Sequence, residues 1–268
     1  MHLNFGFNTV QTLWALTFAA LLILLVVLLG RDRTKRFPFF TASIVLVSLR
    51  LLASRMLFGR LAPMTMSWIF LSLAVVAALA SLLVIVELAR RAFTGATARA
   101  WLIATLAVLA VAAAVLIAWG PWPAWKALTA EGSIAVLRFM QLIAQKADVL
   151  ADLLAVELTL LVVVFGRRFK AGWRSHTQQI LIGLSTAAIA QLAVRGIWQL
   201  IASHAAPHSE AEYEHIMGLQ EKLYNANSVI YIAVLVWWIA CLWRDEPVPT
   251  AIAADAAPEL EAEIPPQA

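Results

Sequence analysis

The sequence predicts an all-α integral membrane protein: a bundle of seven transmembrane helices with the N-terminus outside and the C-terminus in the cytoplasm. Three observations support this prediction: an apolar composition, seven long apolar runs, and basic residues after every second run. Of the 268 residues, 62% are hydrophobic and only 13% are charged, whereas soluble domains are about half apolar and a quarter charged. This composition excludes a cytosolic enzyme, a disordered chain and a nucleic-acid-binding domain as the main interpretation.

A membrane-spanning helix needs about 20 mostly apolar residues. Seven stretches meet this requirement, and each is continuous rather than alternating, which favours helices over the strands of a barrel. In chain order they are Leu13 to Leu29, Phe37 to Phe58, Met66 to Val86, Ala100 to Trp119, Ala147 to Phe165, Ile180 to Ile201, and Leu223 to Trp243.

Basic residues follow the first, third, fifth and seventh stretches. They are Arg31, Arg33, Lys35 and Arg36, then Arg90, Arg91 and Arg99, then Arg167, Arg168, Lys170 and Arg174, and finally Arg244. Lysine and arginine accumulate on the cytoplasmic side of a membrane protein. We therefore expect the N-terminus outside, and a multi-pass protein of the bacterial inner membrane whose first partner is the lipid bilayer.

Two regions are not expected to cross the membrane. Residues 120–145 begin with a turn rich in glycine, proline and tryptophan, and Ile134 to Gln145 is expected to extend the fifth helix beyond the bilayer. Residues 245–268 carry six acidic residues among prolines and alanines and predict a disordered acidic cytoplasmic tail. The predicted transmembrane domain is therefore 1–244.

Charged residues within spans are costly and usually face a bundle interior or a wet cavity. Arg50 in the second span and Arg195 in the sixth both fall in the outer half, when counted from the cytoplasmic boundary. Gln191, Arg195 and Gln199 recur every four residues and share one face of the sixth helix.

The fifth helix supplies the opposite charge. Gln141, Gln145, Asp148 and Asp152 form one polar stripe, because spacings of four, three and four residues return to the same helical face. Glu157 lies deeper and away from that stripe. The seventh helix offers polar side chains at a similar depth, namely Asn225, Asn227, Ser228 and Tyr231.

These residues have two interpretations. In the first, the charges form internal salt bridges that fix the helices against one another. In the second, they line a pocket in the outer half, in which an arginine binds a carboxylate or phosphate of a small anionic ligand. The candidate ligand-binding residues are Arg50, Asp148, Asp152, Gln191, Arg195, Gln199 and Asn225, and Glu157 is a candidate proton relay.

The sequence predicts neither a cofactor nor a metal site. No histidine lies in the middle of a predicted span, which disfavours a haem held between two histidines. Lys222 precedes the last span, so a retinal Schiff base is not expected. We interpret His204 to His215 as a solvated loop rather than a zinc site. The motifs HExxH, GxSxG and the P-loop are absent from the sequence, so we expect no enzymatic activity.

Three functions remain open at this point. A receptor or sensor would bind a small ligand in the outer half and signal through the basic loops to a separate cytoplasmic partner. A small-molecule or proton-coupled transporter would need a path past the midplane and a titrating carboxylate such as Glu157. A structural or assembly subunit would use its charges only for packing.

Two loop runs resemble a known group of proteins. Arg31 to Phe40 reads RDRTKRFPFF, and Gly172 to His176 reads GWRSH. Both are similar to landmarks of an uncharacterised bacterial family of seven-span membrane proteins, found chiefly in soil bacteria of the acidobacterial type. The resemblance implies a family and a span pattern, but no activity, cofactor or site.

Overall fold

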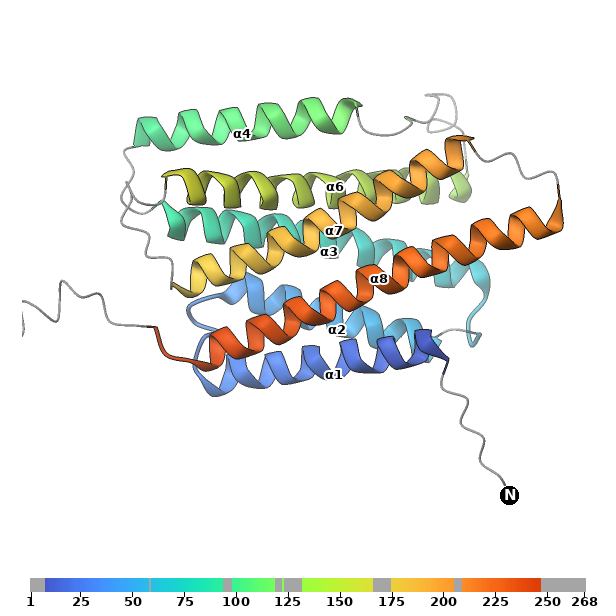
Figure 1. Ribbon diagram of the computed structural model, residues 1–268, viewed down its shortest axis with the longest axis horizontal. Helices are drawn as coiled ribbons and strands as arrows, with labels where there is room; N and C mark the ends of the chain where they lie inside the picture. The colour runs from blue at the N-terminus through green and yellow to red at the C-terminus, as the bar shows by residue number, and fades with distance from the viewer. Residues whose placement is uncertain are drawn as a thin grey trace, which may run out of the picture.

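The computed structural model describes residues 8–57, 59–93, 98–118, 122, 132–165, 175–204 and 209–246. Within these residues the regular secondary structure is entirely helical, with seven helices and no strand, as the sequence predicts (Figure 1). The helices are α1 (Thr9–Gly30), α2 (Pro38–Leu57), α3 (Pro63–Ala92), α4 (Ala98–Ala118), α6 (Ser133–Phe165), α7 (His176–His204) and α8 (Glu210–Trp243).

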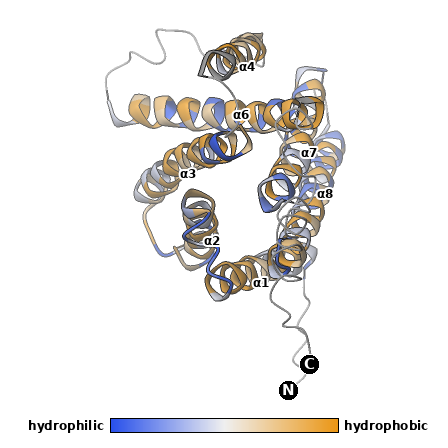
Figure 2. Ribbon diagram, turned by 90° about the vertical axis from the view of Figure 1, so that its left-hand side faces the viewer, coloured by the Kyte–Doolittle hydropathy of each residue, from blue (hydrophilic) through white to orange (hydrophobic). Residues whose placement is uncertain are grey.

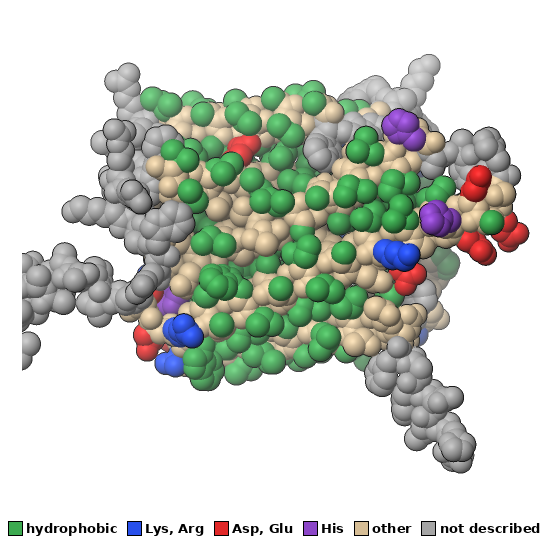
Figure 3. Space-filling model, in the orientation of Figure 1, with side chains coloured by type: hydrophobic (Ala, Val, Ile, Leu, Met, Phe, Trp, Pro, Cys, Tyr) green, Lys and Arg blue, Asp and Glu red, His purple; other side chains and the backbone are tan. Residues whose placement is uncertain are grey.

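Five of these helices are long and apolar enough to cross a membrane: α1, α2, α3, α7 and α8. They identify the chain as a membrane protein. The apolar part of α4 is shorter, from Leu102 to Ala118, and α6 carries three acidic residues, Asp148, Asp152 and Glu157. Figure 3 shows hydrophobic side chains covering the middle of one face, while most charged side chains gather at its two ends.

Six of the seven helices form a closed ring, and α4 lies outside it. Around the ring, α1 packs on α2, α2 on α3, α3 on α6, α6 on α7, α7 on α8, and α8 returns to α1 (Figure 2). The remaining helix, α4, contacts only α6 among the described elements. The ring therefore brings residues from both ends of the chain around one central axis.

The predicted helix extension is confirmed. Helix α6 begins at Ser133 and runs without interruption to Phe165, so Ile134 to Gln145 continues the fifth predicted span. A helix of this length reaches roughly 50 Å, well beyond the hydrocarbon core of about 30 Å.

The predicted outer loop from His204 to His215 is wrong in its second half. Helix α8 begins at Glu210, and the Ser209 hydroxyl caps it by accepting a hydrogen bond from the backbone N–H of Glu212 at 3.3 Å. Acidic residues in the first turn also suit the positive end of the helix dipole. The spacing of Ser209 and Glu212 is that of a capping box, a signal in the sequence that the apolar pattern did not reveal.

The hydrophobic core lies in one half of the bundle. We call the end that carries Arg31, Arg33, Arg36 and Arg244 the basic end. The buried residues of α1 and α8 lie in their last turns, and those of α2 and α7 in their first turns, all toward the basic end. The Trp238 indole packs edge-on against Phe40, with ring centroids 5.1 Å apart.

Three separate segments meet at the basic end. Glu246 accepts a 2.8 Å hydrogen bond from the backbone N–H of His176 and pairs with Arg36 at 2.6 Å. Asp245 pairs with Arg33 at 3.1 Å. We call these five residues the clasp. Asp245 and Glu246, which the composition assigned to the disordered tail, thus bind the α1–α2 connection and the start of α7. The rest of the predicted tail, residues 247–268, lies outside the described part of the chain.

Candidate functional site

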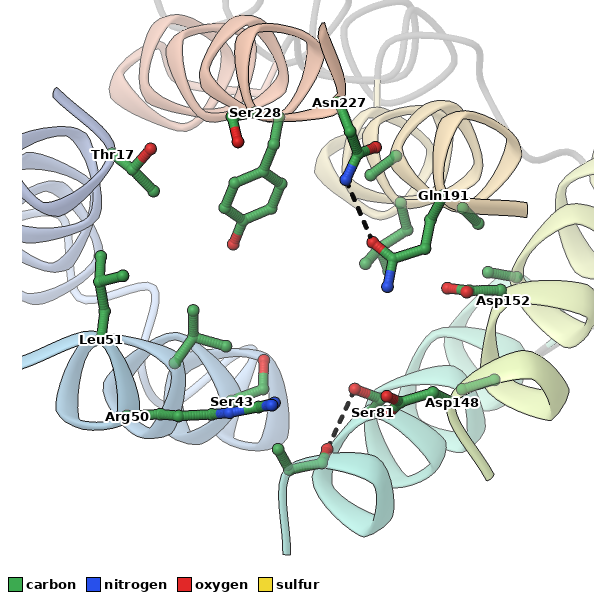
Figure 4. Close-up of a pocket in the computed structure, with 18 of the residues that line it drawn as sticks. Thr17, Ser43, Arg50, Leu51, Ser81, Asp148, Asp152, Gln191, Asn227 and Ser228 are labelled. Carbon is green, nitrogen blue, oxygen red and sulfur yellow. Dashed lines mark hydrogen bonds between the residues drawn. The ribbon is translucent and has the colours of Figure 1, made fainter. Parts of the chain in front are cut away.

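A cavity of about 710 Å³ lies inside the ring, and every ring helix contributes to its lining (Figure 4). On α1 its residues come from the first half of the helix, such as Trp14, and on α2 they run from Ser43 to Ser54 and include Arg50. On α1 the buried core residues occupy the other half. The cavity therefore lies mainly away from the basic end, and its lining also includes the buried side chains of Val84 and Ile85.

One wall of the cavity is acidic. Asp148 and Asp152 both line it from α6, because a spacing of four residues places them on the same helical face. Arg195 of α7 bridges them: its guanidinium lies 3.5 Å from Asp148 Oδ2 and 3.8 Å from Asp152 Oδ2. The pairing expected from the similar depth of these charges is thus present for Arg195, where it joins two neighbouring helices, but the described residues show no such pair for Arg50.

The positive charge of the cavity comes from a different wall. Arg50 lines the cavity from α2, and Figure 4 shows it extending toward the side from which Asp148 and Asp152 project. Its charge acts on Asp148 across the cavity, but within the described residues Arg50 has no ion pair inside 4.0 Å. Arg50 is therefore available to a ligand in a way that Arg195 is not.

Amide and hydroxyl groups form the third side. Asn227 of α8 donates a hydrogen bond of 3.4 Å to the side-chain oxygen of Gln191 on α7 (Figure 4). Asn225, Ser228 and Tyr231 line the cavity beside them. These neutral groups donate and accept hydrogen bonds, so they suit the orientation of a polar ligand.

The α1 side is apolar and held in place. Trp14 lines the cavity, its indole N–H donates to the backbone carbonyl of Leu51 at 3.3 Å, and its ring stacks on Phe18 with centroids 5.5 Å apart. A fixed aromatic wall opposite charged groups is typical of a small-molecule site. It also places a fluorescent reporter at the cavity.

The structure separates the predicted site residues into two groups. Arg50, Asp148, Asp152, Gln191 and Asn225 line the cavity. The other three, Arg195, Gln199 and Glu157, are absent from the described lining.

Each of these three residues has a different environment. Arg195 pairs with the two aspartates, and Gln199 is exposed on α7. Glu157 has a buried carboxylate oxygen, Oε2, without a hydrogen-bond partner among the described residues.

Several lining residues were missed at the sequence level. The polar ones include Thr17, Ser43, Ser54 and Ser81. A signal was available on α2, where Ser43, Val47, Arg50 and Ser54 are spaced by four, three and four residues and so share one face. On α1 and α3 isolated hydroxyls in apolar runs gave no comparable pattern.

Metal ligands do not cluster in the described part of the chain: no group of three histidine, cysteine, aspartate or glutamate side chains is placed to hold an ion there. The fold and the site together define a helical membrane bundle with an internal polar cavity. Comparisons with protein-family models, with curated proteins and with solved structures gave no match.

Proposed function

We propose that this protein is a receptor-like or sensor-like membrane protein that binds a small polar ligand in the ring cavity. The observation that carries the proposal is the cavity itself, in which Arg50 faces two aspartates across an interior closed toward the basic end by the packed core. Ionisable residues inside a membrane bundle are a functional-site hypothesis by default, because burying them is costly.

The proposal includes seven membrane spans, with α4 and α6 crossing beside the five apolar helices. Helix α6 can cross because it packs against α3, α7 and α4, and its aspartates face the cavity rather than lipid. Under the positive-inside rule the basic end is cytoplasmic, so the cavity belongs to the outer half. We place the protein in the bacterial inner membrane, in the family suggested by the RDRTKRFPFF and GWRSH runs.

The purely structural alternative explains Arg195 but leaves Arg50 without a role. Arg195 pairs with two partly buried carboxylates and joins α6 to α7. Arg50 forms no such bridge in the described residues; its charge acts on Asp148 only across the accessible cavity, in the space that a ligand would occupy. This difference makes a binding role the better supported of the two.

A signal would leave through the clasp. Its residues join the α1–α2 connection, the start of α7 and the end of α8, and all four helices also line the cavity. Ligand that changes the spacing of these helices would therefore act on the clasp, where the exposed side chains of Asp245 and Arg36 could meet a separate cytoplasmic partner. We assign the cavity a binding role without covalent chemistry.

The test is thermal unfolding of the detergent-purified protein, followed by tryptophan fluorescence and screened against small polar metabolites. A ligand that binds only the folded state raises the midpoint, by an amount that saturates with its concentration. We expect Arg50→Gln to abolish that shift without lowering the midpoint of the free protein. Arg55→Gln is the matched control, since Arg55 lies on the same helix, is exposed and does not line the cavity.

A broad library without any saturable shift would contradict the binding role and favour the structural subunit. Uptake of a ligand into vesicles that fails in Glu157→Gln would instead favour a proton-coupled transporter.

A further inference from the structure

We infer that the ligand is a small zwitterion, with its anionic group on Arg50 and its cationic group on Asp148 and Asp152; this rests on the binding role proposed above. The inference names a ligand class with two charges of opposite sign. It replaces the simple anion expected from the sequence, because Arg195 is already occupied by the two aspartates.

The acidic wall carries an excess of negative charge. One guanidinium, that of Arg195, serves two carboxylates at 3.5 and 3.8 Å. A single positive charge cannot neutralise two ionised carboxylates, so the α6 side of the cavity is net negative when both aspartates carry a charge. In an interior of low dielectric constant an uncompensated charge attracts a counter-charge strongly.

One hydrogen-bond acceptor on that wall also lacks a donor in the part of the chain that the structure describes. Asp152 Oδ2 is buried and makes no hydrogen bond within the described residues, since the guanidinium of Arg195 at 3.8 Å is too far to donate one. Buried polar atoms are nearly always satisfied in native structures. An ammonium group of a ligand at the accessible part of the Asp152 side chain, which is 22% exposed, would supply the missing positive charge.

Arg50, in contrast, lacks a negatively charged partner in the described part of the chain. Its guanidinium projects from α2 and has no ion pair within the described residues. Arginine binds carboxylates through two parallel hydrogen bonds. A ligand carboxylate at Arg50 and an ammonium at Asp152 would therefore satisfy both walls, with no net charge added to the interior of a membrane protein.

The cavity suits a short ligand. Its volume of about 710 Å³ falls within the range of about 300–1,000 Å³ that is usual for small-molecule sites. Val47, Leu51 and Trp14 line it beside Arg50, so the segment between the two charges of the ligand would be apolar. An unbranched ω-amino acid has this chemistry.

The experiment uses a series of ω-amino acids, from glycine to 6-aminohexanoate, with the alkylamine and the alkanoate of each length as one-charge controls. Binding to the purified full chain is measured by titration calorimetry and tryptophan fluorescence. We expect affinity to peak at one chain length, and the best zwitterion to bind at least tenfold more tightly than either control.

Two variants assign the ends of the ligand. Arg50→Gln should remove the advantage of the zwitterion over the amine, and Asp152→Asn its advantage over the alkanoate. Unfolding midpoints measured in parallel show that each variant is folded. If either variant unfolds, the chain-length and one-charge comparison on the unaltered protein still decides the inference.

An alkanoate that binds as tightly as the zwitterion would overturn the inference, because it would mean that a proton or Arg195 already neutralises the acidic wall. An alkylamine that binds as tightly as the zwitterion would also overturn the inference, because the carboxylate proposed for Arg50 would then add nothing to binding. In both cases the binding function would stand. No binding by any of the three series would overturn the inference alone, since the metabolite screen decides the binding function separately.

Discussion

The carboxylate of Glu87, on α3, accepts a hydrogen bond of 3.0 Å from the backbone N–H of Phe40, in the first turn of α2. One helix thus caps the N-terminus of another. Such a terminus has unsatisfied N–H groups and a partial positive charge, so a buried carboxylate is well placed there. Arg91, one turn further along α3, lies 3.7 Å from the same carboxylate.

Replacing Glu87 by alanine should lower the free energy of unfolding by about 1–3 kcal/mol, because a buried N–H loses its acceptor. Glu87→Gln keeps an oxygen acceptor and should cost less. Thermal unfolding in detergent measures both. Leu83→Ala is the control, since Leu83 lies one turn away on the exposed side of α3; equal midpoints for Glu87→Ala and Glu87→Gln would refute the capping role.

Arg195→Ala should also destabilise the protein, by about 1–3 kcal/mol, because two partly buried carboxylates lose their common partner. The comparison variant is Gln199→Ala, which removes an exposed polar side chain one turn along the same helix and should leave the unfolding midpoint unchanged.

Combining Arg195→Ala with Asp148→Asn and Asp152→Asn should recover part of the stability lost in Arg195→Ala. The effects of substitutions at residues in contact do not simply add. A fully additive result would mean that the three residues do not act as a unit.

Helix α7 approaches α8 closely at Gly183, where an added Cβ would overlap the Trp238 indole. Gly183→Ala should therefore cost about 1–3 kcal/mol through overpacking. Gly218→Ala is the matched control, because Gly218 is also helical and has nothing within 4 Å of the added carbon. This variant protein should be slightly more stable than the unaltered one. Unfolding midpoints that move in the same direction would argue against the close approach.

The clasp should weaken in acid. Burial, the largest single influence, disfavours the charged form of Glu246, but the His176 N–H and the Arg36 guanidinium together outweigh it and hold the pKa below its usual value of 4.5. A lowered pKa in the folded state contributes stability above pH 4.5, and that contribution is lost as the pH falls through the folded pKa.

Glu246→Gln should accordingly reduce stability at neutral pH and flatten its dependence on pH below 4.5. Asp32→Asn is the control. Within the described residues Asp32 pairs only with Lys35, and both side chains are largely exposed, so this ion pair contributes little to stability. Unfolding curves at pH 7 and pH 4 measure the difference. Parallel curves for Glu246→Gln and the unaltered protein would count against the clasp.

The local features of the fold could be predicted from the sequence. Length and continuity of the apolar runs predicted all seven helices, and the polar stripe of α6 predicted that Asp148 and Asp152 share a face. Depth along the helices predicted that Arg195 would meet the aspartates. The start of α8 was missed because its first turns are polar, and an apolar pattern does not detect a helix beyond the membrane.

The order of the helices in the ring, the outer position of α4 and the availability of Arg50 were decided only by the tertiary structure. In lipid, a side chain that faces a neighbouring helix and one that faces the acyl chains can both be apolar, so the sequence does not mark which face packs. Arg50 and Arg195 have the same chemistry and a similar depth. Only the packing of α6 against α7 gave Arg195 two carboxylate partners and left Arg50 in the cavity.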